Sequence, residues 1–147
     1  MPTRYVIVGG GLAATSAIEG IRELDKAGEI VLLAAERELP YHRPPLSKGY
    51  LAGRDQVESV RIHEPSWYRS SGVRVRMGQV AKSVHQKKQS VTLESGEREP
   101  YDRLLLASGS RARRLNAPGA DSAGIVHLRT LGDSGQLHVL LKPGVRL

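Results

Sequence analysis

Short apolar runs and one helical repeat organise the first part of the chain. Arg4–Val8 is rich in β-branched residues and precedes three glycines, which predicts a buried strand. Small and apolar residues then recur at helical spacing, which predicts a helix from about Leu12 to Lys26. Another apolar run, Glu29–Ala35, predicts a second strand. A strand, a helix and a strand within about thirty residues form a βαβ unit, so we expect a parallel sheet.

The middle of the chain alternates between irregular and regular stretches. Three prolines follow Glu36 and oppose regular structure before a short helix predicted at Leu46–Leu51. A second short helix is predicted at Pro65–Ser71. Beyond it, alternating polar and apolar residues predict short strands, with a hairpin between about Val80 and Leu93.

The last third of the chain begins with a predicted buried strand, Arg103–Ala107, which leads into a linker over Arg111–Gly124. His127–Leu141 has helical spacing, although its two glycines each weaken a helix by ~1 kcal/mol relative to alanine. Lys142–Leu147 resembles a turn that opens a strand. Together these elements predict an α/β fold of the Rossmann type, a parallel sheet with helices plus a small antiparallel hairpin or meander.

Composition narrows the classes of protein. The 147 residues are 39% hydrophobic, which is ordinary for a globular domain with its own core. No apolar run approaches the ~20 residues of a membrane span, and no secretory signal pattern is present, so we expect no membrane association and a cytoplasmic protein.

Metal and thiol chemistry are not expected. The chain has no cysteine, which excludes disulfides, redox-active cysteine pairs and thiolate metal sites within it. Its five histidines are scattered and lack metal-ligand spacing, so no metal site is predicted.

The formal net charge of +7 has two interpretations. One is a solvated, arginine-rich surface, and the other is a basic face that steers an acidic partner. A nucleic-acid partner is not expected, because the chain has only five tyrosines, one tryptophan and no phenylalanine, and no basic stripe interleaves with them.

The glycines after the first predicted strand indicate nucleotide binding. Residues 9–14 read GGGLAA and fit the pattern G-x-G-x-x-G/A. Gly9 would allow the sharp turn, Gly11 the close approach of a pyrophosphate, and Ala14 the packing of the helix on the sheet. The helix N-terminus would offer unpaired N–H groups to the anion.

An acidic residue follows the second predicted strand. Glu36 lies roughly 20 residues or a little more past the glycines, the distance expected of a carboxylate that binds a ribose. The alternative interpretation is an exposed loop glutamate without a ligand.

Four stretches of the sequence carry a family resemblance. They are "VIVGGGLAA", "LPYHRPPLSKGYL", "YDRLLLASGSRARRL" and "APGADSAGIVHLRTL". In this order they resemble the FAD-dependent ferredoxin and rubredoxin reductases, which belong with apoptosis-inducing factor to the pyridine nucleotide-disulfide oxidoreductase superfamily. The "PYxRPPLSK" stretch is far more specific than the glycine turn.

The resemblance implies FAD at the glycine turn, with NAD(P)H as co-substrate. Lys48 is implied near the reactive N5 edge of the flavin and is the one residue that the resemblance assigns to catalysis. The implied FAD contacts are Gly9, Gly11, Leu12, Ala13, Ala14, Glu36, Arg43, Pro44, Lys48, Val80, Ala107, Ser108, Gly109 and Arg113.

The sequence also departs from the family pattern. Many relatives carry an acid where this chain has Ala35, so the ribose contact is expected to move to Glu36. Ser108 replaces a threonine, which keeps the hydroxyl, and Ala112 replaces a proline, which loosens the linker.

Family members are much longer, so the resemblance implies that only their first portion is present. Residues 1–113 are expected to be the first portion of an FAD-binding domain, and 114–147 a linker and the start of a truncated NAD(P)H-binding domain. The expected function is to form the FAD-binding portion of an oxidoreductase that passes electrons from NAD(P)H through FAD to a ferredoxin or rubredoxin. The alternative is a truncated, inactive nucleotide-binding or structural remnant, and whether the chain alone is an enzyme stays open. An exposed sheet edge would favour homo-oligomers.

Overall fold

The computed structural model describes residues 1–146, and its contacts divide the chain into two compact units. The sheet unit comprises Met1–Tyr41 and Arg61–Gly109. The proline unit comprises His42–Val60 and Ser110–Leu147 and contains the proline-rich turn. Each unit therefore combines segments that are distant in sequence.

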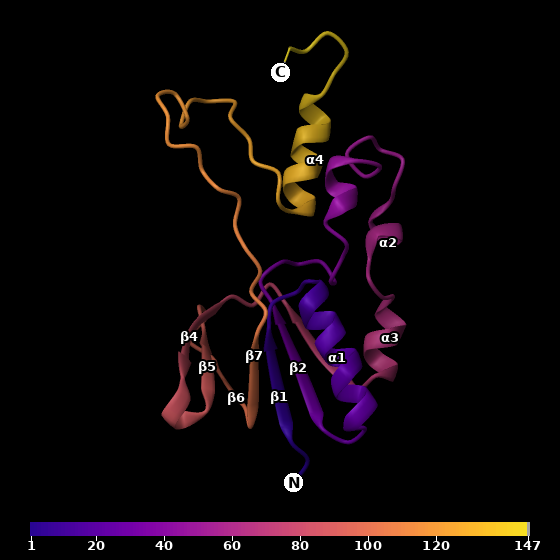
Figure 1. Ribbon diagram of the computed structural model, residues 1–147, viewed down its shortest axis with the longest axis vertical. Helices are drawn as coiled ribbons and strands as arrows, with labels where there is room; N and C mark the ends of the chain where they lie inside the picture. Colours follow the sequence, from indigo (N-terminus) through magenta and orange to yellow (C-terminus); the bar gives the residue numbers. More distant parts are fainter. Residues whose placement is uncertain (147) are drawn as a thin grey trace. The chain divides into compact units, whose positions relative to one another are not determined.

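A four-stranded parallel sheet forms the centre of the sheet unit (Figure 1). Its strands in spatial order are β3 (Val73–Met77), β2 (Glu29–Ala34), β1 (Arg4–Val8) and β7 (Arg103–Leu106). Helix α1 (Leu12–Leu24) connects β1 to β2, which confirms the predicted βαβ unit. The helix ends before the predicted Lys26, because the Asp25 carboxylate accepts the N–H groups of Ala27 and Gly28 in a turn.

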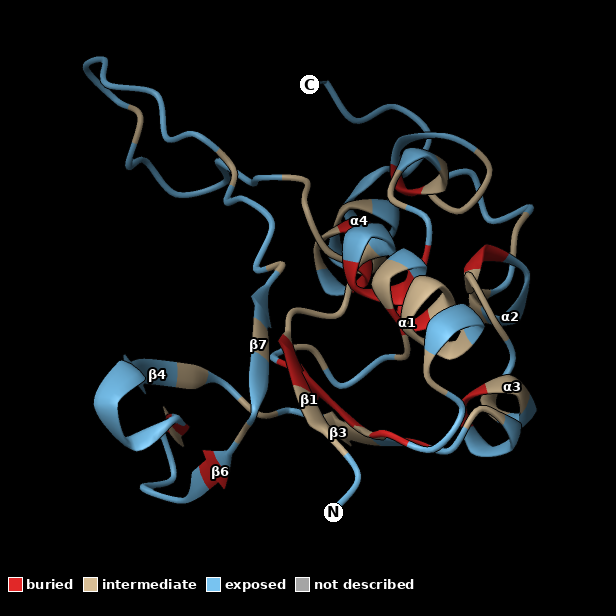
Figure 2. Cartoon of the chain, turned by 60° about the horizontal axis from the view of Figure 1, so that its bottom comes forward, coloured by how far each residue is buried: buried red, intermediate tan, exposed pale blue. Residues whose placement is uncertain are grey.

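Both faces of the parallel sheet are covered. Ile7, Ile30 and Leu32 pack with α1 and with the helix α3 (Pro65–Ser70). The intervening residues along the same strands, such as Val6 and Val31, belong to a second cluster on the opposite face. In Figure 2, β1 is coloured as buried and intermediate, with none of its residues exposed, as expected of a central strand with both faces covered.

A small antiparallel sheet packs against this second cluster through Val91 and Leu93. Its first two strands confirm the predicted hairpin. Its strands in spatial order are β4 (Ala81–His85), β5 (Ser90–Leu93) and β6 (Arg98–Pro100). The short 3₁₀ helix η2 (Gln86–Lys88) and Gln89, at φ 44°, make the turn between β4 and β5. β6 was not predicted, because only three residues, with a terminal proline, form it.

An ion-pair network joins β3 to the small sheet. Arg74 and Arg76 of β3 donate to the two carboxylate oxygens of Glu99 on β6, each at 2.9 Å. Arg76 also donates to Glu97 at 2.6 and 2.7 Å. The Glu99 side chain is only 4% exposed, so its charge depends on these two arginines.

Up to residue 146, the proline unit contains one 3₁₀ helix and two α-helices. They are η1 (Pro44–Ser47), α2 (Val57–Val60) and α4 (Leu131–Leu140). The predicted helix at Leu46–Leu51 was wrong in its bounds: helical structure begins at Pro44, whose fixed φ suits a first turn, and residues 48–53 form turns instead.

The last helix forms despite its two glycines. The Thr130 hydroxyl accepts the Asp133 N–H, and the Asp133 carboxylate accepts the Thr130 N–H, which is a complete capping box. No strand forms over residues 142–146, and the end of the strand predicted there, Leu147, lies outside the described residues. The segment predicted as a linker, Arg111–Gly124, contains neither helix nor strand. No helix within residues 1–146 is long and apolar enough to cross a membrane.

Candidate functional site

The turn between β1 and α1 depends on Gly9. Its φ is +128°, and a Cβ atom there would overlap the carbonyl group of Ala107 at the end of β7. Its N–H donates to the Leu33 carbonyl at 2.9 Å, which ties the turn to β2. Only glycine satisfies both the dihedral angle and the available space.

Gly11, unlike Gly9, is not constrained by its neighbours. Its φ of −120° suits any residue, and a Cβ atom there would meet no other atom within 4 Å. No described side chain caps α1, and no acidic residue occupies its first turn. The amides that begin α1 are therefore available to an anion, and the glycine surface beside them is bare.

The other residues of the glycine motif divide between ligand side and core. Leu12 is 57% exposed and Ala13 is exposed, whereas Ala14 is completely buried in the core. Gly10 packs on the end of β2, where a Cβ atom would lie 2.9 Å from that of Ala34. The structure thus gives Ala14 the packing role expected of the last motif position.

Glu36 follows β2 and is held at both its backbone and its side chain. Its carbonyl accepts the Gly78 N–H at 2.9 Å, and its Oε2 accepts the Tyr41 hydroxyl at 2.5 Å. Tyr41 is only 2% exposed, so the donor itself is fixed. The contact to Tyr41 was missed by the sequence analysis, because no pattern links a tyrosine to an acid five residues away.

Residues after the other two strands lie at the same edge of the sheet. Val80 follows β3, and Ala107, Ser108 and Gly109 follow β7. The Ala107 N–H donates to Val8 at 2.8 Å, and Gly109 has a φ of +69°, so the chain turns directly after β7. Because the strands are parallel, their carboxyl ends form one edge, where ligands of open α/β sheets bind.

The remaining site residues of the sequence analysis belong to the proline unit. Arg43 donates from Nη1 to the Arg129 carbonyl at 2.7 Å, and Pro44 begins η1. Lys48 is exposed, and its N–H donates to the Pro45 carbonyl at 2.9 Å. Arg113 is exposed in the irregular segment.

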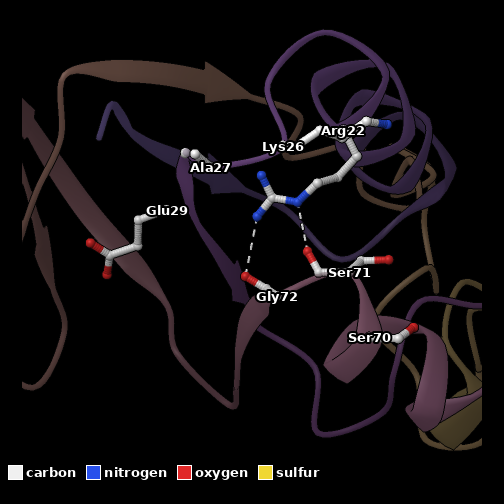
Figure 3. Close-up of a pocket in the computed structure, with 8 residues that line it drawn as sticks. Arg22, Lys26, Ala27, Glu29, Ser70, Ser71 and Gly72 are labelled. Atoms are coloured by element: carbon white, nitrogen blue, oxygen red, sulfur yellow. Dashed lines mark hydrogen bonds between the residues drawn. The ribbon is translucent and has the colours of Figure 1, made fainter. Parts of the chain in front are cut away.

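A cavity of about 530 Å³ occupies the other end of the parallel sheet, near the start of β2 (Figure 3). Arg22 and Lys26 contribute its two positive charges. The Arg22 guanidinium already donates to three carbonyl groups, those of Ser71, Asp25 and Gly72, at 2.6, 3.0 and 3.2 Å. This arginine ties the end of α1 to the turn before β3, so we assign the cavity a structural role.

The carboxyl edge offers groups that suit ligand binding. Within residues 1–146, no three His, Cys, Asp or Glu side chains gather closely enough to hold a metal ion. The free amides and bare glycine surface suit a diphosphate, and the fixed Glu36 carboxylate suits a hydroxyl donor.

Comparison with known proteins finds similarity to ferredoxin reductases. The family model for pyridine nucleotide-disulphide oxidoreductases matches residues 3–147. The chain is 37% identical over 144 residues to the probable ferredoxin reductase CtmF of Castellaniella defragrans, covering 98% of this chain and 35% of the relative. It is 42% identical over 141 residues to the biphenyl dioxygenase system ferredoxin–NAD(+) reductase component of Paraburkholderia xenovorans, covering 96% and 34%.

A solved structure is also similar to this chain. The covalent putidaredoxin reductase–putidaredoxin complex matches with a TM-score of 0.86 and 34% identity, over 94% of this chain and 34% of the other. The chain thus spans about a third of the length of the curated relatives and the solved structure that it matches.

Proposed function

The chain belongs to the pyridine nucleotide-disulphide oxidoreductase family, and from this premise we propose that it forms the FAD-binding portion of an NAD(P)H-dependent oxidoreductase. The electrons would pass through FAD to a ferredoxin or rubredoxin. The observation that carries this proposal is the uncapped start of α1 beside the bare Gly11, at the carboxyl edge of a parallel sheet.

The residues of the glycine turn fit a dinucleotide. Gly11 borders open space, so a pyrophosphate can come close to the backbone without meeting a side chain. The partial positive charge at the start of α1 favours that anion by about 0.3–2 kcal/mol, which orients it more than it binds it. The exposed Leu12 and Ala13 would contribute their N–H groups, while Ala14 keeps the helix close to the sheet.

The ends of β2, β3 and β7 would hold the rest of the adenosine half and the edge of the cofactor. Glu36, oriented by Tyr41, would accept a ribose hydroxyl. Val80 would offer backbone groups to the adenine, and the turn Ala107–Gly109 would lie beneath the cofactor. The proposal for Glu36 is supported by the Tyr41 hydroxyl, which orients the carboxylate, and by the Gly78 N–H, which holds the Glu36 backbone.

The family resemblance also assigns four residues of the proline unit to FAD. Arg43, Pro44 and Lys48 would lie along the flavin and Arg113 near the cofactor. Bound FAD would supply two-electron oxidation of NAD(P)H and one-electron reduction of the carrier. The Lys48 ammonium would hold positive charge near the flavin N5 edge, and with it stabilise electron-rich states of that edge.

The charge of the chain supports an acidic electron carrier. The net charge is +7, and opposite charge on a partner speeds encounter. The chain has no cysteine, so no thiol of its own takes part in the proposed transfer. We propose a cytoplasmic location for the protein.

Equilibrium dialysis of the purified chain against FAD tests the proposed function. We expect saturable uptake of about one FAD per chain, with the visible absorbance of a bound flavin, and competition by ADP, which shares the pyrophosphate. Colourless protein that takes up no FAD at saturating concentrations would contradict the proposal and favour the structural remnant.

A further inference from the structure

Helix α4 donates two side-chain hydrogen bonds to the turn that carries Lys48. The Ser134 hydroxyl donates to the Leu46 carbonyl at 2.7 Å, and the His138 Nδ1 lies 2.7 Å from the Leu51 carbonyl. The two acceptors lie on either side of Lys48, while the two donors lie four residues apart and so share one face of the helix.

The Leu46 carbonyl depends on Ser134 as its donor. Leu46 is 3% exposed and Ser134 is completely buried, so their hydrogen bond is removed from water. A buried carbonyl without a hydrogen bond lowers the stability of the fold. The neighbouring N–H groups of the turn already donate to another carbonyl. In this turn, Lys48 and Tyr50 donate to the Pro45 carbonyl at 2.9 and 3.1 Å, which leaves the Leu46 carbonyl to Ser134.

His138 contacts the turn with its ring as well as with its hydrogen bond. Because a carbonyl only accepts, Nδ1 of His138 must carry the proton in this contact. Gly53, with a φ of +71°, closes the turn beneath the ring, and a Cβ atom there would lie 3.2 Å from the His138 Cε1. The ring therefore fits a turn that only glycine can complete.

We propose that Ser134 and His138 are positioning residues for Lys48. They fix the backbone on both sides of Lys48 and so limit where its ammonium group can lie. This inference rests on the proposed function, since it takes Lys48 as a residue that contacts the flavin. The capping box at Thr130 and Asp133 fixes the start of the same helix, which helps α4 to hold both donors in place.

The side chain at position 138 offers a matched pair of variants. In His138→Asn, the side-chain amide can place an N–H close to the position of Nδ1 and is expected to keep the bond, whereas His138→Leu removes it. Ser134→Ala removes the other donor with little change of volume. Gln136→Ala, at an exposed position of the same helix, is the control.

Hydrogen exchange of the FAD-free 147-residue chain gives the first measurement. Amides of Lys48, Tyr50 and Ala52 report the turn, since all three donate to carbonyl groups within it. We expect exchange at these amides to rise about tenfold in Ser134→Ala and in His138→Leu, and to stay at the wild-type rate in His138→Asn and Gln136→Ala. Wild-type rates in both Ser134→Ala and His138→Leu would overturn the inference.

FAD binding gives the second measurement, which a merely structural brace would not move. We expect the FAD dissociation constant to rise about tenfold and the visible flavin spectrum to shift in Ser134→Ala and His138→Leu, with His138→Asn restoring both. Faster exchange with unchanged FAD affinity and spectrum would overturn the positioning role. If the wild-type chain takes up no FAD, the proposed function fails, and the exchange rates still decide whether the two side chains hold the turn.

Discussion

Two glycines of one motif have different physical tasks. Gly9 is required by the fold, because its dihedral angle and the Ala107 carbonyl both exclude a side chain. Gly11 has no such constraint, since its φ is ordinary and its surroundings are open. A glycine that the fold does not require, such as Gly11, therefore indicates a requirement of the ligand.

Alanine at these two positions should therefore separate stability from binding. We expect Gly9→Ala to lower the free energy of unfolding by about 2 kcal/mol or more, through clash and strain. Gly11→Ala should leave it nearly unchanged and weaken FAD binding by about ten- to a hundredfold, since the amides no longer reach the pyrophosphate. Urea unfolding and FAD titration measure the two effects, and equal FAD affinity in Gly11→Ala and the wild type would contradict the site.

The carboxylate of Asp133 should make the stability of α4 depend on pH. Burial opposes its ionisation, but the N–H groups of Thr130 and Arg129 outweigh this effect and lower the pKa of Asp133. Because the folded pKa is depressed, the stabilisation is present above the unfolded value of about 4 and is lost as the pH falls through the folded value.

Asp133→Asn tests this dependence. We expect the variant to be less stable than the wild type by about 1 kcal/mol at pH 7, with a smaller difference at about pH 3. Thermal unfolding at the two pH values provides the comparison. A difference that grows on acidification would show that the carboxylate does not act as a cap.

At the scale of elements, α4 shows where propensity alone misleads. Its glycines weaken the helix, and the sequence analysis counted them against it. The capping box and the contacts of Ser134 and His138 outweigh them, because helices in proteins gain most of their stability from packing and end contacts.

Gly135→Ala should strengthen this helix. A Cβ atom at Gly135 would meet no neighbour within 4 Å, so alanine costs no space and removes backbone freedom from the unfolded chain. We expect a gain of up to about 1 kcal/mol in the unfolding free energy. Thermal unfolding measures it, and a loss of stability would mean that the glycine has a conformational role.

The ion pairs that β3 makes with Glu97 and Glu99 should contribute unequally to stability. Glu99→Gln removes a charge that is 4% exposed and leaves Arg74 and Arg76 facing an amide, so we expect a loss of about 2–4 kcal/mol. The matched variant Glu97→Gln removes a side chain that is 53% exposed, with an expected loss below about 1 kcal/mol. Urea unfolding compares them, and equal losses would contradict the assigned weights.

Element positions were predictable wherever hydrophobic periodicity is strong. The strands β1 and β2 and the helix α1 follow from apolar runs and spacing, because burial on a two-sided sheet demands such runs. The apolar run at β7 also predicted a strand, but its predicted burial was wrong, because β7 lies at the edge of the sheet with Leu105 and Leu106 39% and 61% exposed. The strand β6 and the bounds of η1 were not predictable, since three residues carry no period and proline fixes only one dihedral angle.

At the scale of the whole molecule, part of the site followed from topology. Once the strands are parallel, residues after β1, β2, β3 and β7 must share an edge, so the glycine turn, Glu36, Val80 and Ala107–Gly109 could be grouped from sequence. The link of α4 to the Lys48 turn could not, because its hydrogen bonds join residues 87 and 88 positions apart.

The division of the chain was also beyond the sequence. The two compact units each combine distant segments, with His42–Val60 in the same unit as α4. The expected boundary between residues 113 and 114 stays a prediction. The homo-oligomer also stays a prediction. Within residues 1–146, β7 pairs only with β1, and its Leu106 is 61% exposed.

The central claim is that the carboxyl edge of the parallel sheet, and no other part of the sheet unit, receives the pyrophosphate of FAD. Amide chemical shifts of the isotopically labelled chain, followed during an FAD titration, test it most directly. The account predicts that the largest shift changes in the sheet unit fall at Gly11, Leu12 and Ala13, with the cavity around Arg22 unaffected. Changes centred on Arg22, Ser71 and Gly72, with the glycine turn unmoved, would contradict it.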